Sequence, residues 1–339
     1  MMFRAFLYSI ICIVLVSCAK DDAIADKDVY PFKTPTGFSE PYIPEHNPLT
    51  YSKIKLGKKL FYDPILSSDG SISCNSCHKQ SLAFSDARTV SLGVGNLPGF
   101  RNAQPLFNLA WSSSFFRDGG VTILELVPLN AIDSHVEFNN NVGDIIHHLN
   151  KSAEYRTLFK LAFNDTATTN NFLQALACFQ RILVSADSPY DHFHFANDSK
   201  ALNESAKRGL ALFNSSKTDC FQCHSGFNFT NSEFLSNGIS ETYPDSGRQR
   251  ITLQIADKGK FRVPSLRNIE YTAPYMHDGS FETLNEVIEH YNSGGKNFSG
   301  KSPLIRPLGL NEQEKIDLVE LLKSLSDTKF IQNKEFYKE

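Results

Sequence analysis

The hydrophobic positions along this chain repeat mostly at helical spacing, and long polar segments separate the repeats. Apolar residues recur every three or four positions over residues 141–162, 171–185, 203–213, 283–292 and 311–325. Runs that alternate apolar and polar residues, which are typical of strands, are scarce. The pattern therefore predicts a mainly all-α protein with long loops and little β structure.

A short glycine-containing segment occurs twice and divides the chain. Gly57-Lys58-Lys59-Leu60-Phe61 lies near the end of one helical pattern, and Gly209-Leu210-Ala211-Leu212-Phe213 lies near the end of another. Between them, an Asp-Ser-Pro sequence at 187–189 interrupts the helical periodicity. We therefore expect two domains, with a boundary near residues 186–197.

Each repeated segment leads into a C-x-x-C-H pentad, Cys74-Asn75-Ser76-Cys77-His78 in the first half and Cys220-Phe221-Gln222-Cys223-His224 in the second. This pentad is the attachment signature of a c-type haem, whose vinyl groups bond the two thiols while the histidine is the proximal iron ligand. The alternatives are a structural disulfide, a redox thiol pair or a zinc site, but neither half offers the second cysteine pair that zinc usually needs. The paired motif predicts two covalent haems in two cytochrome c-like domains, residues 51–190 and 191–339.

The composition limits the classes of partner. Of the 339 residues, 41% are hydrophobic and 21% are charged, which describes a globular protein long enough for two ordinary domains. The net charge is −3. Such a balance argues against nucleic acid as a partner and provides no strong basic field for a membrane surface.

Residues 1–18 have the form of a bacterial export signal. Arg4 precedes an apolar run from Ala5 to Val16, which is too short to cross a bilayer as a permanent helix. The run ends in Leu15-Val16-Ser17-Cys18, which resembles a lipobox. It predicts a lipoprotein signal peptide, a lipidated Cys18 and a lipid anchor as the sole membrane attachment. An ordinary signal peptide with an unmodified Cys18 is the alternative.

The segment that follows, residues 19–50, contains five prolines and is predicted to be a tether. Beyond the pentads, one cysteine is left in the body of the chain. Cys178 lies in an apolar helical stretch and is predicted to be a buried core thiol. Because haems of this type are attached outside the cytoplasm, we expect an exported protein that is periplasmic or on the cell surface.

The distal ligands of the two irons decide what the haems do. A haem with two protein ligands transfers electrons, whereas a haem with one can bind peroxide. Met276 is the only methionine after the signal segment. Tyr291 shares the apolar face of a helix that begins at a capping box of Thr283 and Glu286. From the periodicity alone, a core tyrosine is the favoured interpretation of Tyr291.

Several longer stretches resemble one known family, the bacterial di-haem cytochrome c peroxidases and their relative MauG. These stretches are Val90-Ser91-Leu92-Gly93, Arg101-Asn102-Ala103, Phe115-Phe116-Arg117-Asp118-Gly119, Val136-Glu137-Phe138, Val263-Pro264-Ser265-Leu266-Arg267-Asn268 and Thr272-Ala273-Pro274-Tyr275-Met276-His277-Asp278-Gly279. The resemblance covers roughly the whole chain beyond the predicted tether.

The resemblance implies different distal sides for the two haems. Tyr291 matches the distal ligand of the C-terminal haem, where MauG also has tyrosine, so that haem is expected to be ligated by His224 and Tyr291. Val94 stands where many relatives have a displaceable histidine, so the haem of His78 is expected to be open. Glu137 matches the catalytic acid beside the bound peroxide.

The resemblance also implies one Ca²⁺ between the domains, held by the side chain of Asn102 and the main-chain carbonyls of Thr272 and Pro274. Relatives usually place a tryptophan relay between the haems, but this chain has Arg117 there, and its only tryptophan is Trp111. One expectation is that Arg117 pairs with haem propionates. The other is that Trp111 or a tyrosine replaces the tryptophan relay.

Arg267 and His277 are further candidate propionate partners. The function implied is reduction of hydrogen peroxide with electrons from a small redox protein, a cytochrome c or a cupredoxin. The alternatives are MauG-like oxidation of a protein side chain through high-valent haem, and a purely electron-transferring di-haem cytochrome. A homodimer is also compatible with the resemblance.

Overall fold

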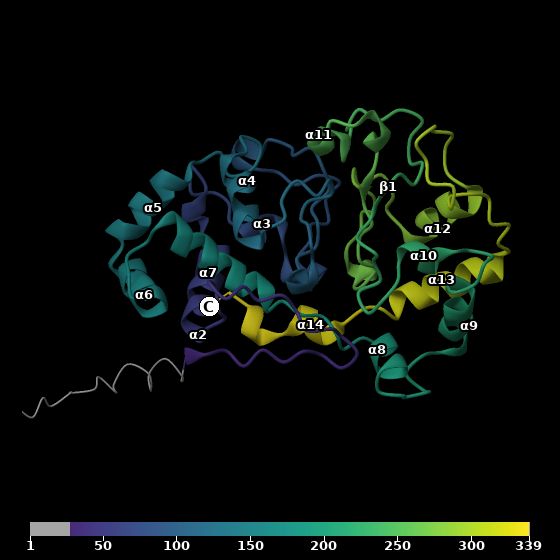
Figure 1. Ribbon diagram of the computed structural model, residues 1–339, viewed down its shortest axis with the longest axis horizontal. Coiled ribbons are helices and arrows are strands. Elements are labelled where there is room, and N and C mark those ends of the chain that lie inside the picture. The colour runs from purple at the N-terminus through teal and green to yellow at the C-terminus, as the bar shows by residue number, and fades with distance from the viewer. Residues whose placement is uncertain (1–27, 339) are drawn as a thin grey trace, which may run out of the picture.

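The structure is a computed structural model that describes residues 28–338. The predicted signal peptide, Cys18 and the start of the predicted tether lie outside the described residues. Within residues 28–338, no helix combines the length and the apolar character needed to cross a membrane. The described chain forms two helical halves side by side, joined by long loops (Figure 1).

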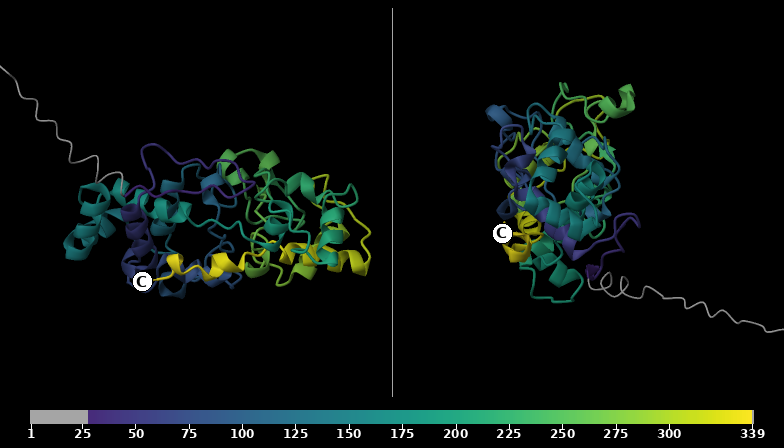
Figure 2. Two further views of the ribbon diagram at one scale, coloured as in Figure 1. Left: turned by 90° about the horizontal axis from the view of Figure 1, so that it is seen from below. Right: turned by 90° about the vertical axis from the view of Figure 1, so that its left-hand side faces the viewer.

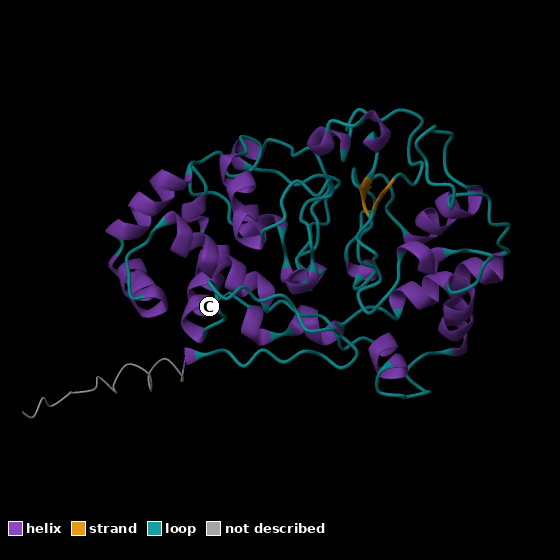
Figure 3. Ribbon diagram, viewed as in Figure 1, coloured by secondary structure: helices purple, strands orange, loops and turns teal. Residues whose placement is uncertain are grey.

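Helices dominate the secondary structure, as predicted (Figure 3). The N-terminal half contains α2 (Tyr51–Tyr62), α3 (Cys74–Cys77), α4 (Val127–Asp133), α5 (Val142–Lys151), α6 (Ala153–Phe163) and α7 (Thr169–Arg181). The C-terminal half contains α8 (Pro189–His194), α9 (Glu204–Phe213), α10 (Cys220–Cys223), α11 (Gln249–Thr252), α12 (Leu284–Ser293) and α13 (Glu312–Lys323). Helix α14 (Thr328–Gln332) follows, and β1 (Phe234–Leu235) pairs antiparallel with β2 (Phe261–Arg262).

The observed helices follow the predicted segments, with one division. The segment predicted as one helix over 141–162 is two helices, because Ser152 ends α5 and its side chain caps α6 by accepting from the Tyr155 amide. The capping box predicted at Thr283 and Glu286 is present at the start of α12, and a second capping box, of Asn311 and Glu314, starts α13.

The repeated glycines lie at equivalent helix crossings. A Cβ atom at Gly57 would lie 1.9 Å from the carbonyl oxygen of Ala175, and one at Gly209 would lie 2.0 Å from that of Asp317. Glycine therefore allows α2 to touch α7 in one half and α9 to touch α13 in the other. Each glycine-bearing helix leads into a haem pentad, so the repeat in sequence is a repeat in structure.

The C-terminal tail crosses the predicted domain boundary. Phe330 and Phe336 belong to the hydrophobic core of the N-terminal half, and both rings pack against Phe84. The hydroxyl group of Tyr62 donates to the carbonyl of Phe336 at 2.7 Å. The tail therefore runs back beneath the N-terminal half (Figure 2), and the prediction that residues 191–339 form one domain is wrong for these last residues.

The described part of the predicted tether is packed against the body. Leu49 and Phe38 are buried, and Asn47, which is 0% exposed, donates to the Glu125 carboxylate at 2.8 Å. Residues 28–50 run across both halves in an extended path (Figure 2). The prediction of a free tether is therefore wrong over these residues, because their apolar side chains and a buried amide find partners in the core.

Candidate active site

The two C-x-x-C-H pentads form the same local structure. Each pair of cysteines bounds a single helical turn, α3 or α10, and the following histidine ends it. His78 Nδ1 donates to the carbonyl oxygen of Phe84 at 2.9 Å, and His224 Nδ1 donates to that of Phe229 at 3.0 Å. Each hydrogen bond uses Nδ1, so Nε2 is the nitrogen available to an iron.

The surroundings of both histidines suit metal ligation. Burial lowers the pKa of His78 and of His224, so both imidazoles are neutral at pH 7. Neutral imidazole with an oriented Nδ1–H is the form that binds a metal. The two pentads therefore fit the c-type haems that the sequence predicts.

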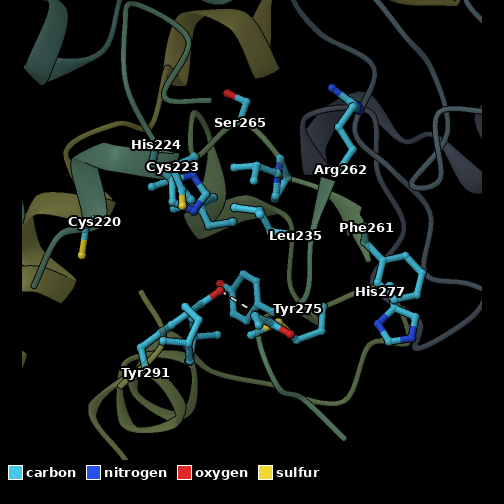
Figure 4. Close-up of a pocket in the computed structure, with 18 of the residues that line it drawn as sticks. Cys220, Cys223, His224, Leu235, Phe261, Arg262, Ser265, Tyr275, His277 and Tyr291 are labelled. Carbon is cyan, nitrogen blue, oxygen red and sulfur yellow. Dashed lines mark hydrogen bonds between the residues drawn. The ribbon is translucent and has the colours of Figure 1, made fainter. Parts of the chain in front are cut away.

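A large, mostly apolar cavity opens beside His224. Its wall includes Cys220, Cys223, Leu235, Met276 and Tyr291. Figure 4 shows His224 and Tyr291 on opposite sides of this cavity, with the cysteines next to the histidine. The predicted pair of axial ligands for the C-terminal haem thus faces one space.

One amide group contacts both side chains that could ligate the distal side of this haem. Asn237 Nδ2 lies 3.2 Å from the sulfur of Met276 and 3.4 Å from the hydroxyl oxygen of Tyr291. Burial raises the pKa of Tyr291, while the hydrogen bond from Asn237 opposes this rise. The sequence analysis missed Asn237, because it lies far from Tyr291 along the chain.

Arg262 also faces this cavity and was not predicted from the sequence. Its Nε atom is buried and has no hydrogen-bond partner, and burial lowers its pKa. Figure 4 places Arg262 at the far end of the cavity from Cys220. The propionates of a haem lie on the edge opposite the vinyl groups, so this unpartnered cation fits a propionate. The arginine is the second residue of β2 and stands between Phe261 and Val263, and a cation between apolar residues is the signal that could have identified it.

Arg267 has a different role from the one considered from the sequence. Its guanidinium pairs with both carboxylate oxygens of Asp191, at 2.8 Å and 2.7 Å, and Nε donates to the carbonyl of Phe227. The Arg267 side chain is 0% exposed and does not line the cavity. We therefore correct the expectation of a propionate partner, because a buried carboxylate already neutralises this cation.

The predicted residues of the N-terminal site lie close together. The Val94 amide donates to the carbonyl of Glu137 at 2.9 Å, and Gly93 packs directly on this backbone, where a Cβ atom would lie 2.1 Å from the carbonyl oxygen of Val136. Burial raises the pKa of the Cys74 thiol, and the nearby charge of Glu137 adds a smaller rise. Glu137 therefore stands beside the haem attachment helix.

The Glu137 carboxyl group has an unusual environment. The residue is exposed, yet desolvation by the protein atoms around the carboxyl group disfavours its charged form and raises its pKa, against the effect of a hydrogen bond from Ser134. His135 is exposed, with its ring against Phe100, as a rim histidine would be. A carboxyl group with a raised pKa beside a cofactor site is suited to exchanging protons.

Two turns of similar sequence, one from each half, lie where the halves meet. We call this place the seam: the part of the cavity wall formed by Asn102 and Arg117 of the first half and Thr272, Pro274 and His277 of the second. The turn Phe115–Gly119 in the first half and Tyr275–Gly279 in the second have the same sequence pattern. Each places a positive φ at its second residue and at its glycine. Arg117 and His277 occupy equivalent positions in the two turns. His277 stacks on Phe261 with ring centroids 3.9 Å apart.

The three residues predicted to bind Ca²⁺ line this seam together, but they do not fit the ion. The side-chain oxygen of Asn102 accepts a hydrogen bond from the guanidinium of Arg117 at 2.7 Å. The other two candidates, Thr272 and Pro274, supply main-chain carbonyls only. The expectation of calcium is therefore not supported by the donor set, since a cation of the protein already holds its side-chain oxygen.

Trp111 lies away from the seam. Its indole nitrogen donates to the carbonyl of Ser39 at 2.7 Å, and its ring packs against Phe38 and Phe227. It does not occupy the position of Arg117 between the halves. An electron-relay role for Trp111 stays a prediction.

Three comparisons with known proteins show which family the chain belongs to. A family model described as di-haem cytochrome c peroxidase matches residues 51–200. The methylamine utilization protein MauG of Methylorubrum extorquens is 38% identical over 286 residues, which cover 83% of this chain and 80% of the relative. Cytochrome-c peroxidase IdrP1 of Pseudomonas sp. strain SCT is 36% identical over 316 residues, covering 84% and 83%.

The fold is shared as well. The crystal structure of a MauG-like protein associated with microbial copper homeostasis superimposes with a TM-score of 0.86 at 33% identity, covering 91% of this chain and 99% of the other. Fold and pentads together define a c-type di-haem oxidoreductase. The chain belongs to the di-haem cytochrome c peroxidase family, whose members carry two c-type haems, and the predicted family and enzyme class are confirmed.

Proposed function

We propose that this protein is a peroxidase that reduces hydrogen peroxide at the haem held by His78, with electrons passed through the haem held by His224. The observation that carries the proposal is the difference between the two sites. Tyr291 faces His224 across its cavity, whereas valine and a protonatable glutamate stand beside the first pentad. The site of His224 thus offers ligands for both sides of an iron, whereas the site of His78 leaves one side free for a substrate.

Glu137 is the proposed catalytic acid and base. The bound haem supplies a redox-active iron that accepts peroxide and delivers electrons to it. Glu137 takes a proton from one peroxide oxygen and returns it to the other, so that the leaving oxygen departs as water. Val94 is small and carries no ligating atom, so it leaves room for peroxide.

The C-terminal site is proposed to relay electrons. With the haem bound, Tyr291 would provide an oxygen ligand that stabilises oxidised iron and lowers the reduction potential. Asn237 would orient that hydroxyl group, and Arg262 would pair with a haem propionate. The donor is proposed to be a small exported redox protein, either a cytochrome c or a cupredoxin.

MauG-like oxidation of a protein side chain is the second candidate. It is favoured by Tyr291, which matches the ligand expected for MauG, and by the 38% identity to a protein named MauG. The two candidates differ in the molecule that is oxidised. Turnover of peroxide with a reduced cytochrome supports the first, and radical transfer to a protein partner without such turnover supports the second.

The absorption spectrum of the oxidised protein is the decisive experiment. We expect one high-spin, five-coordinate haem and one low-spin haem without the sulfur-to-iron band, and we expect cyanide to bind the resting protein. Tyr291→Met should gain the sulfur band, while Tyr275→Phe, in the same cavity, should not. Two low-spin haems, neither of which binds cyanide, would contradict the proposal and favour a protein that only transfers electrons.

The location follows from the export signal. We propose an exported lipoprotein, periplasmic or on the cell surface, attached through a lipid on Cys18. Metabolic labelling with a fatty acid should mark the wild-type protein and leave Cys18→Ser unlabelled. A homodimer is part of the same proposal, and sedimentation of the holoprotein measures it.

A further inference from the structure

The seam between the halves contains a guanidinium that is bound entirely by neutral oxygens. Arg117 Nη2 donates to the Asn102 side-chain oxygen at 2.7 Å, and Nε donates to the Asn102 carbonyl at 3.2 Å. Both contacts go to one residue, so Asn102 clasps the cation. Arg117 takes part in none of the ion pairs found among residues 28–338.

Main-chain hydrogen bonds beside this clasp join the two halves of the molecule. The Asn102 amide donates to the carbonyl of His277 at 2.9 Å, and the Arg262 amide donates to the carbonyl of Arg117 at 2.7 Å. Both members of the clasp are thus bonded through their main chain to the C-terminal half.

The local charge disfavours a second cation. Arg101 and Arg262 are cations that lie near Arg117, and the carboxylate of Asp278 lies near it as well. Asp118 and Asp245 pair with Arg101 and not with Arg117. A divalent ion would meet the charges of these arginines, and the three predicted ligands offer it only amide and carbonyl oxygens, whereas calcium sites normally include carboxylates.

We propose that the guanidinium of Arg117 is the resident cation of this seam and occupies the place that the family resemblance assigns to Ca²⁺. The protein then assembles its halves and holds both haems without calcium. This inference does not depend on which molecule the haems oxidise, because it concerns a structural cation and not the reaction.

Calcium binding to the holoprotein tests the inference directly. After treatment with a chelator, the haem spectrum and the melting temperature should be unchanged. Titration with CaCl₂ to about 1 mM, the weak end of the range for protein calcium sites, should give no heat of binding. One equivalent bound in the micromolar range, or loss of the haem spectrum on chelation, would overturn the inference.

Variants at the clasp test the role of the guanidinium. Arg117→Ala frees the Asn102 oxygen and should gain calcium affinity by about tenfold or more, with a melting temperature that rises on adding calcium. Arg117→Lys keeps the charge and should bind no better than wild type. The double variant Arg117→Ala, Asn102→Ala should lose the gain.

Arg248→Ala is the matched control, because this nearby arginine contacts main-chain carbonyls of Asp118 and Gly119 and not Asn102. It should bind calcium no better than wild type. Failure of Arg117→Ala to gain affinity, or an equal gain in the control, would show that Arg117 does not occupy a metal position.

Discussion

Three arginines differ in how their charge is satisfied. Arg267 pairs with the carboxylate of Asp191, Arg117 is held by neutral oxygens of Asn102, and Arg262 has a buried Nε without a partner. A buried charged group without a partner is costly, so each arrangement indicates what completes it. Asp191 makes the first a structural pair, Asn102 holds the second, and we expect a haem propionate to complete the third.

The pair of Arg267 and Asp191 also affects stability at low pH. Burial alone would raise the pKa of Asp191, but hydrogen bonds and charge from Arg267, with hydrogen bonds from Ser188, lower it. A lowered pKa in the folded state stabilises the protein above the usual aspartate pKa of about 3.9. This stabilisation is lost as the pH falls below that value.

The first prediction concerns Glu137. Glu137→Gln removes the proton carrier and should lower kcat/KM for hydrogen peroxide by about 10²- to 10⁴-fold. Because the pKa of Glu137 is raised and the base must be deprotonated, activity should fall on the acid side at a pH above the ordinary glutamate pKa of about 4.3. A pH profile of peroxidase turnover measures both effects.

His135→Gln is the control for this prediction, since His135 is exposed two residues away. It should keep near wild-type activity. Equal losses of peroxidase activity in the two variants would mean that activity depends on the conformation of the loop around residues 135–137 and not on the Glu137 carboxyl group.

At the scale of elements, each half is organised by one close helix crossing. The crossing of α2 with α7 and that of α9 with α13 both depend on a glycine, and each orients the loop that enters a haem pentad. In the C-terminal half, the capping box at Thr283 starts α12, and Tyr291 lies on this helix. Local capping thus sets the position of a predicted iron ligand.

The second prediction concerns the glycine of the first crossing. Gly57→Ala would normally stabilise a helix by about 0.5–1 kcal/mol. Here the added Cβ would lie 1.9 Å from the Ala175 carbonyl oxygen, so we expect a loss of about 1–3 kcal/mol in the free energy of unfolding. Denaturant unfolding followed by circular dichroism measures the change.

Gly99→Ala provides the comparison, because its Cβ would sit at an ordinary 3.5 Å from the Ser91 oxygen. Its effect should be small. A stabilised Gly57→Ala protein would show that the helices can separate without cost and would contradict the proposed role of the crossing.

At the scale of the whole molecule, the C-terminal tail ties the two halves together. After α13 completes the C-terminal half, α14 runs back under the first half, and its Phe330 ring enters that core (Figures 1 and 2). Residues 28–50 cross the body in addition, with Phe38 beside Phe227 of the C-terminal half. The tail, this segment and the seam are therefore among the places that link the halves.

The third prediction tests the tail. Phe330 is 3% exposed, and Phe330→Ala should cost about 3–5 kcal/mol of unfolding free energy through the cavity it leaves. The loss should affect the N-terminal half, so the high-spin haem signal should disappear at a lower temperature than in the wild-type protein. Tyr337→Ala, at a side chain that is 44% exposed, should have little effect.

The sequence by itself determined the features that depend on residues close together in the chain. The haem pentads span five positions, and the capping boxes of α12 and α13 join residues three apart, so their chemistry is local. The repeated glycine segment and the helical periodicity likewise predicted two helical halves. Local hydrogen bonds and side-chain spacing are sufficient to specify such features.

Only the tertiary structure decided which distant groups meet. The packing of Phe330 on Phe84, the clasp of Arg117 by Asn102, the pairing of Arg267 with a carboxylate and the unpartnered Nε of Arg262 all depend on how the chain folds in three dimensions. A charged or apolar side chain has many potential partners, and its position along the chain does not select one. The burial that makes each pairing necessary exists only in the folded molecule.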